Sequence, residues 1–173
     1  MNNQFRLLLV ALGFVVLIGG QPSFSQHIEC LEYEEMLEKR LPKEAPVVYV
    51  DEVNTNTPNL VFLDTREKEE YTVSHIEKAI HVGYTHLDLS AVEKLPKNTP
   101  IVVYCSIGYR SGKVTEKLVD AGFTNVKNLF GGIFEWSNQE RLLVDQDGNV
   151  TQKVHAYNKR WGKWITHGDK VYN

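Results

Sequence analysis

The sequence predicts an α/β fold in which a central parallel sheet of about five strands is covered by helices on both faces. Short apolar, β-branched runs bounded by turn-forming residues alternate along the chain with segments of helical periodicity. This alternation is typical of parallel strands connected by helices. The length of 173 residues and a hydrophobic content of 42% are sufficient for one domain with a sizeable core.

Residues 1–25 have the features of an export signal. Arg6 precedes the apolar run Leu7 to Ile18, whose 12 residues are fewer than the roughly 20 that cross a bilayer as a helix. Ser23 to Ser25 then supply a small-x-small cleavage pattern before Gln26. We expect a cleaved signal peptide and a periplasmic or secreted protein. The alternative is an uncleaved signal that anchors the domain to the outer side of the membrane.

An N-terminal extension over residues 26–43 and a domain over residues 44–140 follow the signal. In the extension, Leu31 to Leu41 is expected to form a short surface helix that ends at Pro42. The domain contains four segments with the length and composition of buried strands. These are Val47 to Val50, Val61 to Leu63, Ile101 to Tyr104 and Val126 to Leu129.

Helical segments are expected between and after these strands. The apolar side chains of two of them recur at intervals of three or four residues. Gly122 is well placed to end the third helix at its C-terminus. The predicted helices are Lys68 to Ser74, Leu87 to Leu95, Ser111 to Ala121 and a short one around Ile133 to Asn138.

A C-terminal extension over residues 141–173 does not continue the alternation, and we expect it to pack on the domain. Asp145 to Asn149 is typical of a turn between two short strands. The extension also carries an aromatic and basic cluster, which either packs on the core or forms the rim of the functional site. Its members are His155, Tyr157, Lys159, Arg160, Trp161, Lys163 and Trp164.

Charge and cysteine content narrow the classes of function. The formal net charge of −3 gives no indication of binding to nucleic acid, and no membrane contact is expected beyond the export signal. Two cysteines, Cys30 and Cys105, do not make a disulfide-stapled scaffold, although a single bridge between them is an alternative. Cys30 is either a lone thiol near the N-terminus or a resolving thiol for Cys105.

The segment from Ile101 to Gly112 is the most informative part of the chain. It reads as a strand, a loop and the start of a helix, with Cys105 directly after the strand. Ligands bind at the carboxyl ends of parallel strands, and a loop that enters a helix there directs its backbone N–H groups toward an anion. Helix N-termini and nearby cations such as Arg110 lower the pKa of a thiol, and Gly108 allows a tight turn. Cys105 is therefore a candidate nucleophile.

The spacing within this loop separates two chemistries. Four residues lie between Cys105 and Arg110, one fewer than in phosphatases that are built on a cysteine loop. The shorter loop makes a smaller pocket, which suits attack on a sulfur atom better than enclosure of a phosphoryl group. This spacing argues against a phosphatase or an arsenate-reductase-like enzyme.

This loop and three further motifs resemble the rhodanese domain family. The family loop Cys-x-x-Gly-x-Arg is present as residues 105–110, and the similarity extends from about Glu44 to Gln139. The other motifs are Asp64-Thr65-Arg66 with Glu70-Tyr71, His75-Ile76 with Ala79-Ile80, and Gly131-Gly132-Ile133 with Trp136. Two departures, Ser74 in place of a glycine and Val82-Gly83 in place of a turn with proline, concern local loop geometry.

The resemblance implies a rhodanese-like three-layer fold and a sulfurtransferase that needs no metal or other cofactor. Cys105 would take sulfane sulfur from thiosulfate, a persulfide or a polysulfide and pass it to a thiol, including one on a protein, or to cyanide. Many members that use thiosulfate have a basic residue directly after the cysteine, whereas this chain has Ser106. The resemblance implies substrate binding by the loop residues Ser106, Ile107, Gly108, Tyr109 and Arg110.

Four residues outside the loop are expected to support it. Asp64 and Arg66 are interpreted as an ion pair that fixes the loop geometry, and Glu70 as a carboxylate that braces Arg110. His75 is expected to bind backbone rather than to transfer protons. The alternative to the enzyme is a non-catalytic rhodanese-like module that binds a protein partner or an oxyanion in the same cleft.

Overall fold

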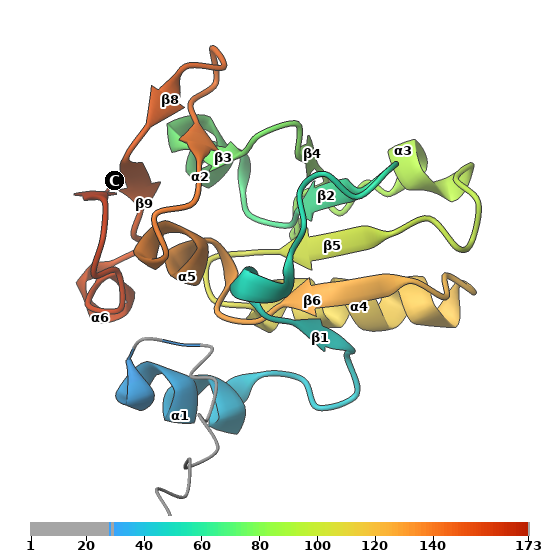
Figure 1. Ribbon diagram of the computed structural model, residues 1–173, viewed down its shortest axis with the longest axis horizontal. Helices are drawn as coiled ribbons and strands as arrows, with labels where there is room; N and C mark the ends of the chain where they lie inside the picture. The colour runs from blue at the N-terminus through green and yellow to red at the C-terminus, as the bar shows by residue number, and fades with distance from the viewer. Residues whose placement is uncertain (1–27, 29, 173) are drawn as a thin grey trace, which may run out of the picture.

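The computed structural model describes residues 28 and 30–172, so the expected export signal at residues 1–25 lies outside the described residues. A five-stranded parallel sheet forms the centre of the molecule, in the order β1-β6-β5-β2-β4 (Figure 1). The predicted fold class is confirmed. The strands are β1 (Val47–Val48), β2 (Val61–Asp64), β4 (Ile80–His81), β5 (Ile101–Tyr104) and β6 (Val126–Leu129).

Six α-helices and one short 3₁₀ helix accompany this sheet in the described part of the chain. None of the helices there has the length and apolar character needed to cross a membrane. The helices are α1 (Leu31–Arg40), η1 (Val50–Glu52), α2 (Lys68–Val73), α3 (Ser90–Glu93), α4 (Tyr109–Asp120), α5 (Gly132–Asn138) and α6 (Lys159–Gly162).

Alternate side chains of the central strands enter two separate hydrophobic clusters, because successive residues of a strand point to opposite faces of a sheet. In β2, Phe62 lies in one cluster and Leu63 in the other. The first cluster contains buried residues of α1 and α5, among them Leu37 and Phe134. The second contains Val114 of α4. Helices therefore cover both faces of the sheet.

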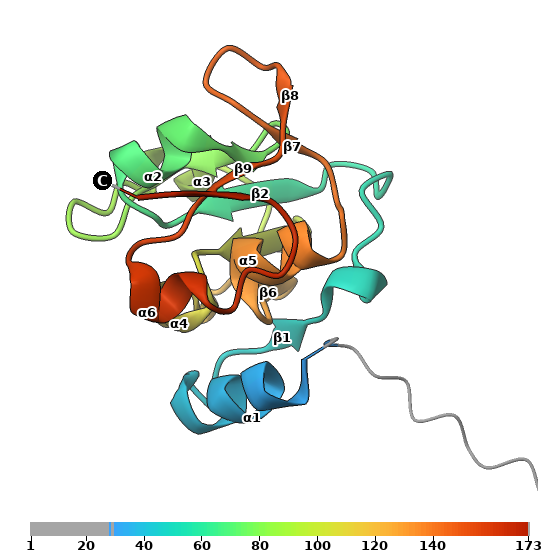
Figure 2. The same ribbon diagram turned by 90° about the vertical axis from the view of Figure 1, so that its left-hand side faces the viewer.

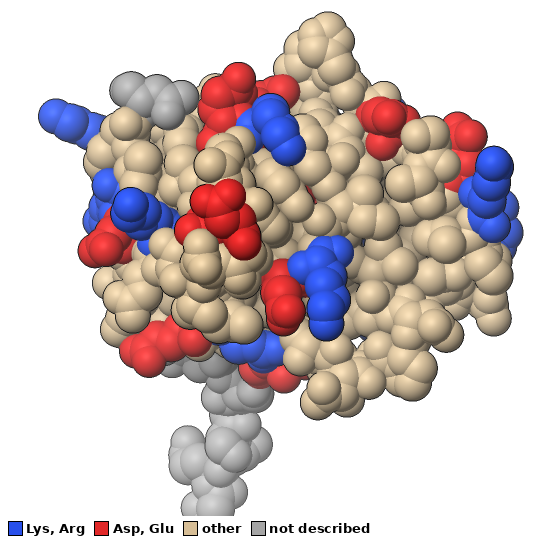
Figure 3. All heavy atoms as spheres, turned by 90° about the horizontal axis from the view of Figure 1, so that it is seen from above, with Lys and Arg blue, Asp and Glu red and all other residues tan. Residues whose placement is uncertain are grey.

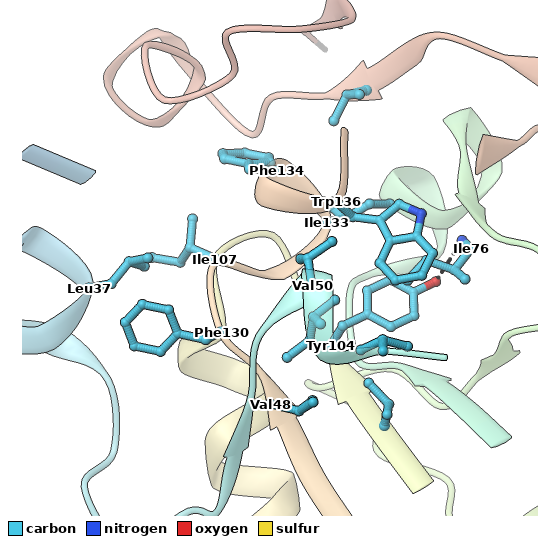
Figure 4. Packing of buried hydrophobic residues seen from close by; sticks show 14 of the residues in the cluster. Leu37, Val48, Val50, Ile76, Tyr104, Ile107, Phe130, Ile133, Phe134 and Trp136 are labelled. Atoms are coloured by element: carbon cyan, nitrogen blue, oxygen red, sulfur yellow. Dashed lines mark hydrogen bonds between the residues drawn. The ribbon is translucent and has the colours of Figure 1, made fainter. Parts of the chain in front are cut away.

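Tyr104, the last residue of β5, lies within the first cluster. Figure 4 shows its ring close to Val50 and Trp136, with its hydroxyl toward Ile76. The backbone N–H of Ile76 donates to this hydroxyl at 3.1 Å. Such a bond satisfies a polar group that burial would otherwise destabilise, and it fixes the strand end that precedes Cys105.

Helix α4 ends where the sequence predicts. Gly122 has a φ of +88°, and its N–H donates to the carbonyl of Val119 at 2.9 Å. The N–H of Phe123 donates to the carbonyl of Leu118 at 3.0 Å. This pair of bonds is the Schellman arrangement, in which a left-handed residue satisfies the last carbonyls of a helix.

Two elements are shorter than the sequence predicts. The expected strand Val47 to Val50 divides into β1 and η1. The expected helix Leu87 to Leu95 is reduced to α3, because the Asp88 carboxylate accepts the N–H of Ser90 at 2.9 Å and holds the preceding backbone in a turn. Helix α3 also ends before Pro96, which disfavours a helical conformation in the residue that precedes it.

The C-terminal segment forms a second, smaller layer against the sheet. Strands β7 (Leu143–Val144) and β8 (Val150–Thr151) make an antiparallel pair, with the expected turn between them, and β7 also pairs with β3 (His75–Ile76). Strands β9 (Lys153–His155) and β10 (Asp169–Val171) run parallel to each other (Figure 2). This segment contributes four buried residues to the hydrophobic cluster that contains α1 and α5, namely Leu143, Val154, Ala156 and Ile165.

Candidate active site

Cys105 lies at the carboxyl end of the sheet, directly between β5 and the loop that leads into α4. It is 1% exposed and contributes to the wall of a cavity of about 400 Å³. The carboxyl ends of β2 and β6 flank it, as expected for a ligand site on a parallel sheet. The cavity is lined by Arg40, Cys105, Ser106, Ile107, Tyr109, Arg110, Tyr157 and Trp161.

The loop stabilises Cys105 in its thiolate form. The N–H of Gly108 donates to Sγ at 3.1 Å. Burial raises the pKa of the thiol, but the positive charge of Arg110 and hydrogen bonds from Ser111 and Ile107 outweigh it, so that the pKa lies below its usual range. A thiolate is the reactive form of cysteine, which makes Cys105 a competent nucleophile.

Strand β6 holds the loop from below through Asn128, which is buried. The Asn128 amide donates to the carbonyl of Gly108 at 3.0 Å, and its carbonyl oxygen accepts the hydroxyl of Ser111 at 2.7 Å. Sequence reasoning did not identify either Ser111 or Asn128. An amide side chain in a predicted strand and a hydroxyl in the first turn of a helix were the available signals.

Helix α5 holds the loop from the other side. The N–H groups of Ile133 and Phe134 donate to the carbonyls of Cys105 and Ser106 at 2.9 and 3.1 Å. A Cβ atom on Gly132, whose φ is +59°, would lie 2.4 Å from the Cys105 carbonyl oxygen. The close approach of the two backbones therefore depends on this glycine.

Glu70 connects α2 to the loop. Its carboxylate accepts two hydrogen bonds from Arg110, at 2.7 and 2.8 Å, and one from the Ser106 hydroxyl at 2.9 Å. Burial acts to raise the pKa of Glu70, but the bonds and charge of Arg110, with a contribution from Arg66, lower it to about 2. Glu70 is thus ionised at neutral pH and holds the Arg110 guanidinium in one orientation.

The ion pair expected between Asp64 and Arg66 is present, and both side chains are fully buried. The closest contact joins Arg66 Nη2 and Asp64 Oδ2 at 2.7 Å, and Nη2 also donates to the carbonyl of Ser74 at 2.6 Å. Neither residue lines the cavity. Their role is to join the end of β2 to the segment that follows α2.

His75 also lies outside the cavity lining. Its Nδ1 is 3.1 Å from the carbonyl oxygen of Tyr71, and its ring stacks on the Tyr71 ring with centroids 3.9 Å apart. Burial lowers the pKa of His75. The residue therefore contacts the backbone and the ring of Tyr71 and does not line the cavity.

The N- and C-terminal segments supply the outer part of the cavity. Arg40 comes from the end of α1, and Tyr157 and Trp161 come from the aromatic and basic cluster of the C-terminal segment. Trp164, another member of that cluster, instead stacks on Tyr33 of α1 at 5.2 Å. The cluster thus divides between the rim of the cavity and the core.

The two cysteines are not bridged, and Cys30 is half-buried beside the first cluster. Within residues 28 and 30–172, no group of three His, Cys, Asp or Glu side chains is placed to hold a metal ion. The arrangement at Cys105 therefore offers a nucleophilic sulfur, a cradle of N–H donors and a fixed guanidinium.

Comparisons with known proteins agree with this geometry. The family model of the Rhodanese-like domain matches residues 49–139. Thiosulfate sulfurtransferase GlpE of Coxiella burnetii is 36% identical over 78 residues, which are 45% of this chain and 72% of that protein. The adenylyltransferase and sulfurtransferase UBA4 of Meyerozyma guilliermondii is 35% identical over 94 residues, but the match covers only 21% of its length and 50% of this chain.

Solved structures show the same likeness. A crystal structure of thiosulfate sulfurtransferase from Pseudomonas aeruginosa is 25% identical with a TM-score of 0.55, and the match covers 77% of this chain and 25% of that one. A rhodanese-related protein from Thermoplasma volcanium, 24% identical with a TM-score of 0.51, shares the fold over 57% of this chain and 97% of its own.

Proposed function

This chain belongs to the rhodanese-like domain family, and we propose that it is a sulfurtransferase that carries sulfane sulfur as a persulfide on Cys105. The observation that supports the proposal most is the environment of Sγ, which combines a lowered pKa, N–H donors and access to a cavity. The relatives named thiosulfate sulfurtransferase support the same class of reaction.

The first half of the reaction loads the cysteine. The Cys105 thiolate attacks the sulfane sulfur of the donor, a bond forms between Sγ and that sulfur, and the donor's S–S bond breaks. With thiosulfate as donor, the electron pair of the broken bond leaves with sulfite. The N–H groups of the loop are placed to stabilise the negative charge that the persulfide retains.

The second half of the reaction removes the sulfur from Cys105. An acceptor thiolate, or cyanide, attacks the outer sulfur of the persulfide, and the electron pair of the S–S bond returns to Sγ of Cys105. Neither step requires a general base once the thiolate has formed. This is consistent with the position of His75 outside the cavity lining.

The test is an intact mass measurement on the purified protein after incubation with thiosulfate or a polysulfide. We expect a mass increase of one sulfur atom in the wild type and in Cys30→Ser, and none in Cys105→Ser. The added sulfur should disappear when cyanide or a small thiol is supplied. If the wild type takes up no sulfur from either donor, the transferase proposal fails and a binding module in the same cleft replaces it.

The proposed partners are small sulfur-containing anions and thiols. On the face shown in Figure 3, basic and acidic side chains alternate, and neither sign forms a continuous patch. A face of mixed charge does not favour polyanions such as nucleic acid, and the formal net charge of −3 does not favour them either.

We also propose that the protein is exported, on the basis of the apolar run at Leu7 to Ile18 and the cleavage pattern before Gln26. The test is expression in a bacterium followed by fractionation and N-terminal mass analysis. A periplasmic protein that begins at Gln26 would support cleavage. An intact chain in the membrane fraction would support the anchored form, and an intact cytoplasmic chain would exclude export.

A further inference from the structure

Three residues of the cavity around Cys105 lie outside the segment that matches the family model, residues 49–139. They are Arg40, Tyr157 and Trp161, and we call them the outer subsite. We propose that the outer subsite binds the aryl group of an organic, anionic sulfane-sulfur donor, and that this chain therefore prefers aryl thiosulfonates to thiosulfate. The inference rests on the proposed sulfurtransferase function.

The size and lining of the cavity favour an organic donor. Its volume of about 400 Å³ lies in the range of roughly 300 to 1,000 Å³ that holds organic ligands. Ile107 and Tyr109 of the loop line the same cavity as Tyr157 and Trp161 and add to its apolar and aromatic surface. Thiosulfate would occupy only the part beside the loop, where the N–H donors are, and would leave the aromatic part without a ligand.

The distribution of charge points the same way. The Arg110 guanidinium already has a carboxylate partner, Glu70, to which it donates two hydrogen bonds. Arg40 is exposed, and its guanidinium lies 5.6 Å from the centre of the Trp161 ring. None of the ion pairs among the described residues includes Arg40. Arg40 therefore supplies a positive charge that attracts an anionic donor, while Tyr157 and Trp161 offer ring faces to its aryl group.

The backbone of Tyr157 provides an independent observation. Tyr157 is 55% exposed and has a φ of +60°, a left-handed conformation that costs a bulky residue about 1 to 2 kcal/mol. The ring lies over the guanidinium of Arg110 at 5.9 Å. Asparagine or glycine would adopt this backbone more easily. A strained, exposed ring above the reactive loop is the signature of a binding residue rather than of a core residue.

The loading step with such a donor balances without a further reagent. The Cys105 thiolate attacks the terminal sulfur of the thiosulfonate, the new bond joins Sγ to that sulfur, and the bond between the two donor sulfurs breaks. Its electron pair leaves with the aryl sulfinate. The two negative charges at the start become one on the persulfide and one on the sulfinate.

The experiment compares benzenethiosulfonate, methanethiosulfonate and thiosulfate as donors, with cyanide as acceptor and thiocyanate as the measured product. The variant is Tyr157→Asn, which removes the ring and suits the left-handed backbone. We expect kcat/KM for benzenethiosulfonate to fall about tenfold, as the loss of an aromatic contact of about 1.4 kcal/mol would produce. The value for methanethiosulfonate should stay within about twofold of the wild type, because it has no ring.

The quantity compared is the ratio of kcat/KM for benzenethiosulfonate to kcat/KM for methanethiosulfonate. The change in this ratio between the wild type and Tyr157→Asn does not depend on the intrinsic reactivity of the two donors, because each donor is measured with both proteins. Tyr84→Asn is the matched control, because Tyr84 is 38% exposed and lies outside the cavity lining. It should leave the ratio unchanged. Tyr157→Asn should keep or raise the melting temperature, which excludes misfolding as the cause.

A second measurement needs no variant. Benzenesulfinate, the product of the loading step, should inhibit turnover of thiosulfate about tenfold more strongly than methanesulfinate does. Suppose that all three donors load Cys105, that Tyr157→Asn leaves the ratio unchanged and that the two sulfinates inhibit equally. The proposal that the outer subsite binds an aryl group would then be wrong, while the sulfurtransferase function would stand. If none of the donors loads Cys105, the proposed function itself fails.

Discussion

At the scale of single residues, the properties of the site depend on two charges that are held close to one sulfur. Arg110 favours the thiolate of Cys105, and Glu70 holds Arg110 in place. Because these groups are buried or half-buried, their interactions are stronger than those of surface charges. Changes at either charge should therefore have measurable effects on reactivity and on stability.

Arg110→Gln should raise the pKa of Cys105, because it removes a positive charge that stabilises the thiolate. The midpoint of the pH dependence of alkylation by iodoacetamide should move to higher pH. At pH 7 the alkylation rate should fall, because a smaller fraction of the Cys105 thiol is ionised. The measurement is made in a Cys30→Ser background. Lys113→Gln, a change of a cation in the same helix outside the cavity lining, should leave the midpoint in place.

Glu70 should contribute to the loss of stability in acid. Its pKa is about 2 in the folded protein and about 4.3 in an unfolded chain. The contribution is complete above about pH 4.3 and is lost as the pH falls toward 2, by on the order of 3 kcal/mol. In Glu70→Gln, the free energy of unfolding measured with urea should be lower at pH 7 and should depend less on pH over this window.

The exposed neighbour of Glu70 serves as its control. Glu69→Gln should leave the free energy of unfolding close to that of the wild type, both at pH 7 and as the pH falls toward 2. If Glu70→Gln and the wild type lose the same free energy of unfolding as the pH falls toward 2, the proposed contribution of Glu70 is contradicted.

At the scale of elements, the site is assembled from the ends of helices and strands. Helix α5 begins with N–H groups that bind the carbonyls of the cysteine loop, and β6 reaches the loop through Asn128. Both contacts join elements that are separated from the loop in the sequence. The position of the loop thus depends on how closely α5 approaches it.

Gly132→Ala should disrupt this approach, since the added Cβ would lie 2.4 Å from the carbonyl oxygen of Cys105. We expect a loss of stability of more than about 3 kcal/mol and a loss of persulfide formation. Gly122→Ala is the matched control, because Gly122 also has a positive φ but its Cβ would meet nothing within 4 Å. It should lose about 1 to 2 kcal/mol and keep its activity. Thermal melting and intact mass after thiosulfate treatment measure both effects.

At the scale of the whole molecule, the segments outside the family match belong to the same hydrophobic core as the sheet. Tyr33 and Leu37 of α1 and Val154, Ala156 and Ile165 of the C-terminal segment are buried in one cluster with α5. The Tyr33 hydroxyl also donates to the carbonyl of Gly131 at 2.8 Å, next to the start of α5.

A fragment of residues 44–140 should therefore fail to fold cooperatively. Without α1 and the C-terminal segment, the face that contains Phe134 would be exposed, and each large apolar side chain so exposed loses about 1.5 to 3 kcal/mol. Near-ultraviolet circular dichroism and thermal melting of the fragment and the whole chain measure this. A sharp melting transition in the fragment, at the temperature of the whole chain, would contradict the prediction.

Features that depend on neighbours along the chain could be predicted from the amino-acid sequence. The alternation of apolar runs and helical segments predicted the α/β class, and the pattern of Ile101 to Gly112 placed the Cys105 loop between a strand and a helix. The hydrophobic period and the position of Gly122 predicted α4 closely, because helices and their caps are built from local contacts.

Features that depend on contacts between distant residues became visible only in the folded molecule. The fifth strand, β4, has two residues and is defined by its pairing with β2, so no pattern of its own predicted it. Asn128 reaches the loop across 20 positions. Arg40 and Trp161 meet beside Cys105 because α1 and the C-terminal segment pack on the same face of the sheet. Sequence periodicity identifies a buried face, but it does not specify which distant segment covers that face.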